Sequence, residues 1–193
     1  MQLRFLLLFL LLSSCSIKKN NYQNYNIEDL EYDFFNNNII SIFEVKDEKV
    51  KLFLNEKPLA ISESLKSIFS IEKFNEYLNP TLGVEYEKIR ELTRVLDFKY
   101  LSNYVVSRSE WNQKRISKNV ILINNDKIRY EKKGNSAIFL ITKPIFNKEK
   151  NIAFVVFTSK SFSGNFYEGV YLKVFKLKKK NKWLFFTKIP LTL

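Results

Sequence analysis

The segment "SAIFLITKPIFNKEKNIAFVVFTS", residues 136–159, gives the strongest indication of the fold class of this chain. It holds two apolar, β-rich runs, 136–146 and 151–159, that are separated only by the polar link 147–150. A link this short can join antiparallel strands, whereas a parallel pair needs a crossover of a dozen or more residues. Two further β-rich runs, 169–177 and 182–189, follow after short links. We therefore predict an antiparallel meander, with residues 152–157, apolar on both faces, as its central strand.

The residues before this meander predict a hairpin, a strand and three helices. A hairpin is expected over 119–132, with its turn at 124–126, and alternating apolar residues predict a strand over 49–54 that turns at 55–57. Helical spacing predicts helices that start near Asn26 and run through residue 35, that span 62–78 with Ser62 or Ser64 as cap, and that span 83–101, with Asn79–Pro80 separating the last two. The expected fold is α+β, a single domain over 27–193 with N-terminal helices packed on the meander. This arrangement resembles the curved sheets of NTF2-like and cystatin-like folds.

The first 14 residues have the layout of a secretory signal peptide. A start that carries Arg4 is followed by the apolar run 5–12 and by two small side chains, Ser13 and Ser14. A membrane-spanning helix needs about 20 apolar residues, so this segment is too short to be a permanent span. We assign residues 1–14 to targeting and exclude them from the fold.

The four residues 12–15, "LSSC", end in the single cysteine of the chain. They resemble the lipobox of bacterial lipoproteins. The resemblance implies diacylglyceryl transfer to the sulfur of Cys15, cleavage between Ser14 and Cys15, and acylation of the new amino terminus. Two or more acyl chains anchor a protein stably, and the polar residues 15–26 then form a lipidated flexible tether. The alternative is a cysteine that ends an ordinary signal peptide by coincidence.

The residues after Cys15 bear on the location of the anchored protein. The second residue of the mature chain is Ser16 rather than Asp, which by the sorting rules of such lipoproteins favours the outer membrane of a Gram-negative cell. No acidic cluster follows Cys15, which favours the periplasmic side. The segment 141–183 also resembles the C-terminal part of uncharacterised bacterial lipoproteins and secreted proteins, a resemblance that implies no activity.

The composition removes most catalytic chemistry. The chain has no histidine, its one cysteine is assigned to lipid, and its glycines do not form a phosphate-binding loop, so we expect no metal and no cofactor. A carboxylate-dependent hydrolase of envelope polysaccharide stays open as an alternative, because such enzymes need only two acidic residues. The candidate carboxylates lie at the spacings of solvated helix faces and are Glu28, Asp29, Glu31, Asp33, Glu85, Glu87 and Glu91.

The charge of the chain points to an anionic partner or to compositional bias. The formal net charge is +12, and Lys, Asn, Ile, Phe and Tyr are all used heavily. Nucleic acid is a poor partner for an exported chain. The candidate patch for an anionic glycan or lipid comprises Lys176, Lys178, Lys179, Lys180 and Lys182, with Phe162, Phe166 and Tyr167 as a candidate ligand rim; the alternatives are a solvated hairpin and loop anchors. The sequence thus favours a non-enzymatic, lipid-anchored envelope protein that binds an envelope protein, glycan or lipid.

Overall fold

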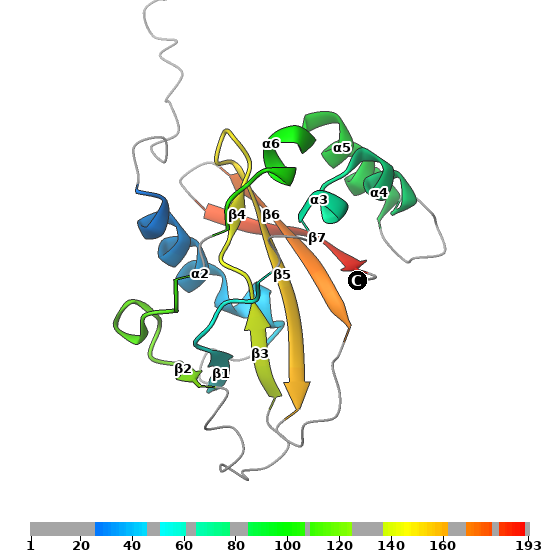
Figure 1. The fold of residues 1–193 in the computed structure, drawn as a ribbon. Coiled ribbons are helices and arrows are strands. Elements are labelled where there is room, and N and C mark those ends of the chain that lie inside the picture. Colours follow the sequence, from blue (N-terminus) through cyan, green and yellow to red (C-terminus); the bar gives the residue numbers. More distant parts are fainter. Residues whose placement is uncertain are drawn as a thin grey trace, which may run out of the picture.

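The computed structural model describes residues 26–45, 51–60, 65–77, 85–106, 109–124, 137–161, 169–178 and 182–191. Within these ranges the strands form one open, mixed sheet in the order β2-β1-β3-β5-β6-β7, with β4 beside β5 (Figure 1). The strands are β1 (Leu52–Asn55), β2 (Val120–Ile123), β3 (Ala137–Ile141), β4 (Ile145–Phe146), β5 (Ile152–Ser161), β6 (Val170–Lys178) and β7 (Lys182–Leu191). The helices are α2 (Ile27–Phe43), α3 (Leu65–Ile68), α4 (Ile71–Glu76), α5 (Tyr86–Val95), α6 (Phe98–Ser102) and the 3₁₀ turn η3 (Gln113–Arg115).

The α+β class and the C-terminal meander are confirmed. Strands β3, β5, β6 and β7 are antiparallel neighbours in chain order. Strand β5 lies inside the sheet, and its residues 152–159 are buried along both faces. The continuous apolar run predicted this position, because a central strand that is covered on both sides cannot alternate with polar residues.

On its N-terminal side the sheet has a parallel part, in which β1 lies between β2 and β3, and the sequence did not predict this pairing. Strand β1 pairs in parallel with both β2 and β3. The segment between β1 and β2 contains the short helices, and it is long enough to return the chain to the same end of the sheet before β2 begins. Strand β2 is the first strand of the hairpin predicted over 119–132, and residues 125–132, which include the predicted second strand, lie outside the described residues.

The run 136–146 is not one continuous strand, as predicted, but two strands joined by a bulge. Ile141 of β3 pairs with Phe157 of β5, and Ile145 of β4 pairs with Phe154 of β5. The chain therefore advances four residues from β3 to β4 while the paired stretch of β5 advances three. The extra residue lies in Thr142–Lys143–Pro144, where proline cannot donate to the ladder. As a result Ile141 packs on one face of the sheet and Ile145 on the other.

The predicted helices exist, but their bounds differ. Helix α2 is capped by Asn26, whose side chain accepts from the Glu28 backbone, and it continues to Phe43 because its last turns still bury apolar side chains. The predicted helix 62–78 is interrupted at Ser70, which caps α4, and the predicted helix 83–101 is interrupted at Asp97, which caps α6. Short polar side chains that bond the backbone start a new helix rather than extend the old one. The predicted caps Ser62 and Ser64 lie outside the described residues.

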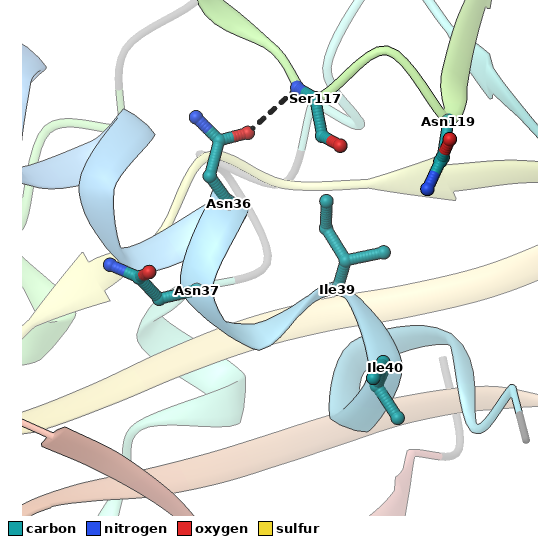
Figure 2. Close-up of a pocket in the computed structure, with 6 residues that line it drawn as sticks. All are labelled: Asn36, Asn37, Ile39, Ile40, Ser117 and Asn119. Atoms are coloured by element: carbon teal, nitrogen blue, oxygen red, sulfur yellow. Dashed lines mark hydrogen bonds between the residues drawn. The ribbon is translucent and has the colours of Figure 1, made fainter. Parts of the chain in front are cut away.

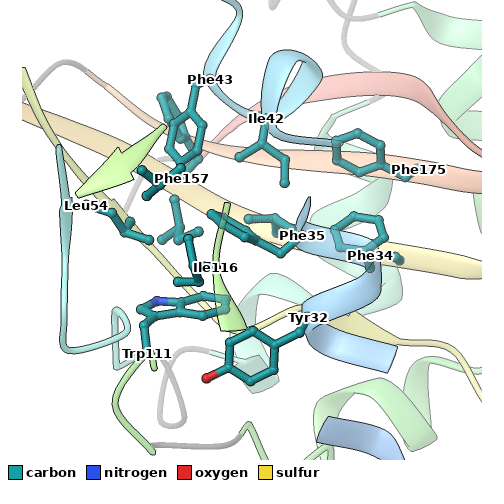
Figure 3. Packing of buried hydrophobic residues seen from close by; sticks show 14 of the residues in the cluster. Tyr32, Phe34, Phe35, Ile42, Phe43, Leu54, Trp111, Ile116, Phe157 and Phe175 are labelled. Atoms are coloured by element: carbon teal, nitrogen blue, oxygen red, sulfur yellow. The ribbon is translucent and has the colours of Figure 1, made fainter. Parts of the chain in front are cut away.

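Each face of the sheet has its own hydrophobic core. Helix α2 covers one face, where Phe34 packs edge-on against Phe146, Phe175 and Trp183. Figure 3 shows Phe34 beside Phe175 in this core. Helices α3 to α6 cover the other face, where Phe69 packs against Phe154 of β5. The helices therefore form two separate layers, one on each side of the sheet (Figure 1).

Candidate functional site

Glu31 of α2 and Lys143 of the bulge form a buried ion pair. The side chain of Glu31 is 4% exposed and that of Lys143 is fully buried, with 3.8 Å between Glu31 Oε2 and Lys143 Nζ. Lys143 reaches α2 because the bulge allows it to leave the regular ladder on the side of the sheet that α2 covers. The pair therefore joins the first described helix to the middle of the meander.

Two aromatic rings surround the ammonium group of Lys143. Its Nζ lies 3.9 Å from the ring centroid of Trp111 and 4.4 Å from that of Tyr32. Lys143 also donates to the Tyr32 hydroxyl at 3.4 Å, and the same hydroxyl accepts the backbone N–H of Asn112 at 2.9 Å. Cation–π contacts of this kind offset part of the cost of removing an ammonium from water.

Burial changes the proton affinity of both partners. Desolvation raises the pKa of Glu31 to about 7, and the positive charge of Lys143 opposes this rise. Desolvation lowers the pKa of Lys143, and the carboxylate of Glu31 opposes that fall. Among the described residues Glu31 Oε2 has no hydrogen-bond partner, since Lys143 Nζ lies beyond hydrogen-bond distance. Glu31 therefore changes its charge near neutral pH.

Arg115 of η3 contacts the ring of Tyr32, the same ring that contacts Lys143. Its guanidinium carbon is 4.1 Å from the ring centroid of Tyr32, and it forms ion pairs with Glu28 at 2.8 Å and with Asp29 at 2.5 Å. The cluster of predicted carboxylates at the start of α2 is thus divided: Glu28 and Asp29 bind Arg115 at the surface, and Glu31 points inward.

The remaining predicted carboxylates lie at the surface. On α2, Asp33 accepts a hydrogen bond from the Asn37 side chain at 2.9 Å. Glu85, the N-cap residue of α5, pairs with Lys88 at 2.7 Å, while Glu87 of α5 is exposed. Glu91 is also on α5, and it pairs with Lys176 of β6. Asp33, Glu85 and Glu91 are each balanced by a neighbouring polar or basic group, as on an ordinary solvated helix face.

The candidate basic patch is divided in the structure. Lys176 forms its ion pair with Glu91 and has its Nζ 3.6 Å from the ring centroid of Phe186, so it fastens α5 to β6 and β7. Lys178 and Lys182 face each other across the β6–β7 register and are exposed. The other predicted site residues lie outside the described ranges; they are Lys179, Lys180, Phe162, Phe166, Tyr167, Ser14 and Cys15.

Sequence reasoning missed a second buried cation, Lys173 of β6. It is fully buried, donates to the carbonyl of Ile42 at the end of α2, and pairs with Glu44 at 2.9 Å. Glu44 also pairs with Lys188 at 3.0 Å. Burial lowers the pKa of Lys173, and the hydrogen bond and charge of Glu44 oppose this. A cation here satisfies the free carbonyl groups and the negative end of the helix dipole.

The sequence around Lys143 and around Lys173 contains a signal that could have indicated each buried lysine. Lys143 precedes a proline inside an apolar run, and a proline inside a strand often marks a bulge. Lys173 stands between Leu172 and Val174 in the middle of a strand, where an inward charge needs a buried partner. Neither signal identifies the partner, because Glu31 and the end of α2 are far away in the chain.

A shallow recess of about 160 Å³ lies beside α2 (Figure 2). Its lining comprises Asn36, Asn37, Ile39, Ile40, Ser117 and Asn119. The Asn36 amide donates to the Arg115 carbonyl at 2.8 Å and accepts from the Ser117 backbone at 3.0 Å, which holds the wall in place. The recess offers amide, hydroxyl and apolar groups, and it contains no titratable side chain.

In the described parts of the chain, no group of three or more Cys, His, Asp or Glu side chains is arranged to hold a metal ion. The helices of these parts are also too short or too polar to cross a bilayer. Comparison of the chain with known protein families, with curated proteins and with solved structures gave no match.

Proposed function

We propose that this chain is a lipid-anchored protein of the cell envelope whose α+β body is a non-enzymatic binding module. The observation that carries the proposal is the sequence "LSSC" at residues 12–15, directly after an apolar run and with the only cysteine of the chain at its end. Acylation at Cys15 attaches the body to the membrane through the polar residues that precede α2.

The chemistry of the described body supports binding rather than catalysis. Its buried charged side chains face one another or a helix end: Glu31 faces Lys143, and Lys173 faces the end of α2. The recess beside α2 is lined by amides, a hydroxyl and two isoleucines, which suit recognition of a polar surface but supply no general acid or base. The proposed partner is an envelope protein, glycan or lipid.

The proposed location is the outer membrane, with the body in the periplasm. Ser16 rather than Asp as the second mature residue and the lack of acidic residues directly after Cys15 support this choice. The basic net charge of +12 suits an envelope rich in phosphate and carboxylate groups.

Replacement of Cys15 by serine tests the anchor. The native protein should sediment with membranes, incorporate a labelled fatty acid, and show an acylated N-terminal cysteine by intact mass. The Cys15→Ser variant should lose the label and leave the membrane fraction. Ser16→Ala is the matched control and should stay acylated. An unmodified thiol in the native protein would overturn the anchor.

Crosslinking in cells tests the binding role. A photoreactive residue placed at Asn37, in the recess, should capture an envelope component, and one placed at exposed Glu87 on α5 serves as the control. Identical products from both positions, or none from Asn37, contradict a binding role for the recess.

A further inference from the structure

In the described part of the chain, the outer edge of β2 is covered by the side chain of Gln113. The Gln113 carboxamide accepts the backbone N–H of Leu122 at 2.9 Å through Oε1 and donates to the backbone carbonyl of Val120 at 2.9 Å through Nε2. The Leu122 N–H and the Val120 carbonyl, both on β2, thus bind the same side-chain amide. Backbone N–H and C=O groups of an added strand would make the same two bonds.

The groups that Gln113 binds point away from the sheet. On the inner side, the backbone N–H of Leu52 donates to the carbonyl of Asn119 and that of Glu56 donates to the carbonyl of Ile123. Groups of alternate residues along a strand point to opposite edges. The N–H of Leu122 and the carbonyl of Val120 therefore lie on the edge opposite to β1, where a further strand could add.

The sequence of β2 makes this edge suitable for pairing with itself. The strand reads Val-Ile-Leu-Ile and has no charge, proline or glycine. Natural edge strands usually carry such residues, because an uncharged β-branched edge pairs readily with another chain. Here the protection comes from Gln113 of η3 rather than from the strand.

We propose that the outer edge of β2 is a self-association surface, that its partner is β2 of a second copy of this chain, and that Gln113 holds it closed. An antiparallel pair with its two-fold axis at Ile121 places the Leu122 N–H of each copy opposite the Val120 carbonyl of the other. Those are the two groups that the Gln113 amide binds. The same bonds can therefore be made within one chain or between two, but not both.

Shortening the side chain of Gln113 and measuring the mass of the protein in solution tests the proposal. Gln113→Ala removes both bonds, and Gln113→Asn keeps the amide but is one methylene too short to make both. In sedimentation velocity both variants should form dimers at concentrations where the native protein is monomeric. Lys114→Ala, an exposed neighbour in η3, is the matched control and should behave as the native protein.

A second substitution distinguishes strand pairing from general aggregation. Ile121→Lys in the Gln113→Ala background places two like charges opposite each other at the proposed axis, and it should return the variant to the monomer. Amide exchange gives an independent readout, because the Leu122 N–H should exchange about fivefold faster in monomeric Gln113→Ala than in the native protein. A monomeric mass for both Gln113 variants overturns the proposal, whatever the exchange rate of the Leu122 N–H, as does a dimer that Ile121→Lys does not dissociate.

Discussion

The carboxylate of Glu31 and the ammonium of Lys143 lie 3.8 Å apart in the interior, although one belongs to the first described helix and the other to a bulge in the C-terminal meander. Each charge reduces the cost of burying the other, and the rings of Tyr32 and Trp111 enclose the ammonium. Buried pairs of this kind add little net stability compared with apolar side chains of the same size, but removal of one partner is costly. The pair joins α2 to the bulge of the meander.

Glu31 should make stability depend on pH. Its folded-state pKa of about 7 lies above its ordinary value of 4.5, so between these values the folded protein holds a proton that the unfolded chain has released. This contribution to the unfolding free energy is complete below pH 4.5, and on the order of 3 kcal/mol is lost as the pH rises through 7. Glu31→Gln should remove that loss. Urea unfolding at a series of pH values measures the unfolding free energy, with exposed Glu87→Gln as control. If the unfolding free energy of Glu31→Gln changes with pH as steeply as that of the native protein, the prediction is wrong.

Lys143→Met should destabilise the protein more at high pH than at low pH. It leaves Glu31 buried without its cation, which at pH 8 costs about 3–5 kcal/mol. At pH 5 Glu31 binds a proton and the cost should fall. The double variant Glu31→Gln/Lys143→Met has no buried charge at this site and should recover most of the loss. Additive effects of the two single substitutions in denaturant unfolding would show that the side chains are not coupled.

Lys173→Met should loosen the C-terminal end of α2. The variant keeps a long apolar side chain but leaves the carbonyl of Ile42 and the carboxylate of Glu44 without their buried cation, at a cost of about 3 kcal/mol. Lys188→Met removes the more exposed partner of Glu44 and should cost under about 1 kcal/mol. Hydrogen exchange should locate the change in the last turn of α2. An equal loss of unfolding free energy in Lys173→Met and Lys188→Met would show that the burial of Lys173 does not set the cost of its removal.

Phe34→Ala should be among the most damaging core substitutions. The ring is fully buried and meets Phe146, Phe175 and Trp183, so its removal should cost about 3–5 kcal/mol in unfolding free energy. Phe185→Ala removes a ring that is 45% exposed on β7 and should cost about 1 kcal/mol or less. Thermal unfolding of the two variants compares them directly, and a loss for Phe34→Ala no larger than that for Phe185→Ala contradicts the assignment of the core.

The predictions that the structure confirms are those that depend only on residues close together in the sequence. The unbroken apolar run at 152–157 predicted a central strand, and short links predicted the antiparallel order of β3, β5, β6 and β7. Asn26 was correctly placed at the start of a helix. The breaks at Ser70 and Asp97 were missed, because periodicity continues across them while a single side-chain hydrogen bond decides where the helix restarts.

The sequence alone determined the α+β class, the order of the meander and the central position of β5, because these follow from apolar periodicity and loop length. It also supplied the motif at Cys15, on which the proposed anchor depends. Three features are visible only in the folded protein: β1 lies parallel between β2 and β3, Lys143 and Lys173 are buried, and Gln113 covers the edge of β2. The physical reason is that each of these depends on a partner that is distant in the chain, and the partner is set by packing in three dimensions rather than by local propensity.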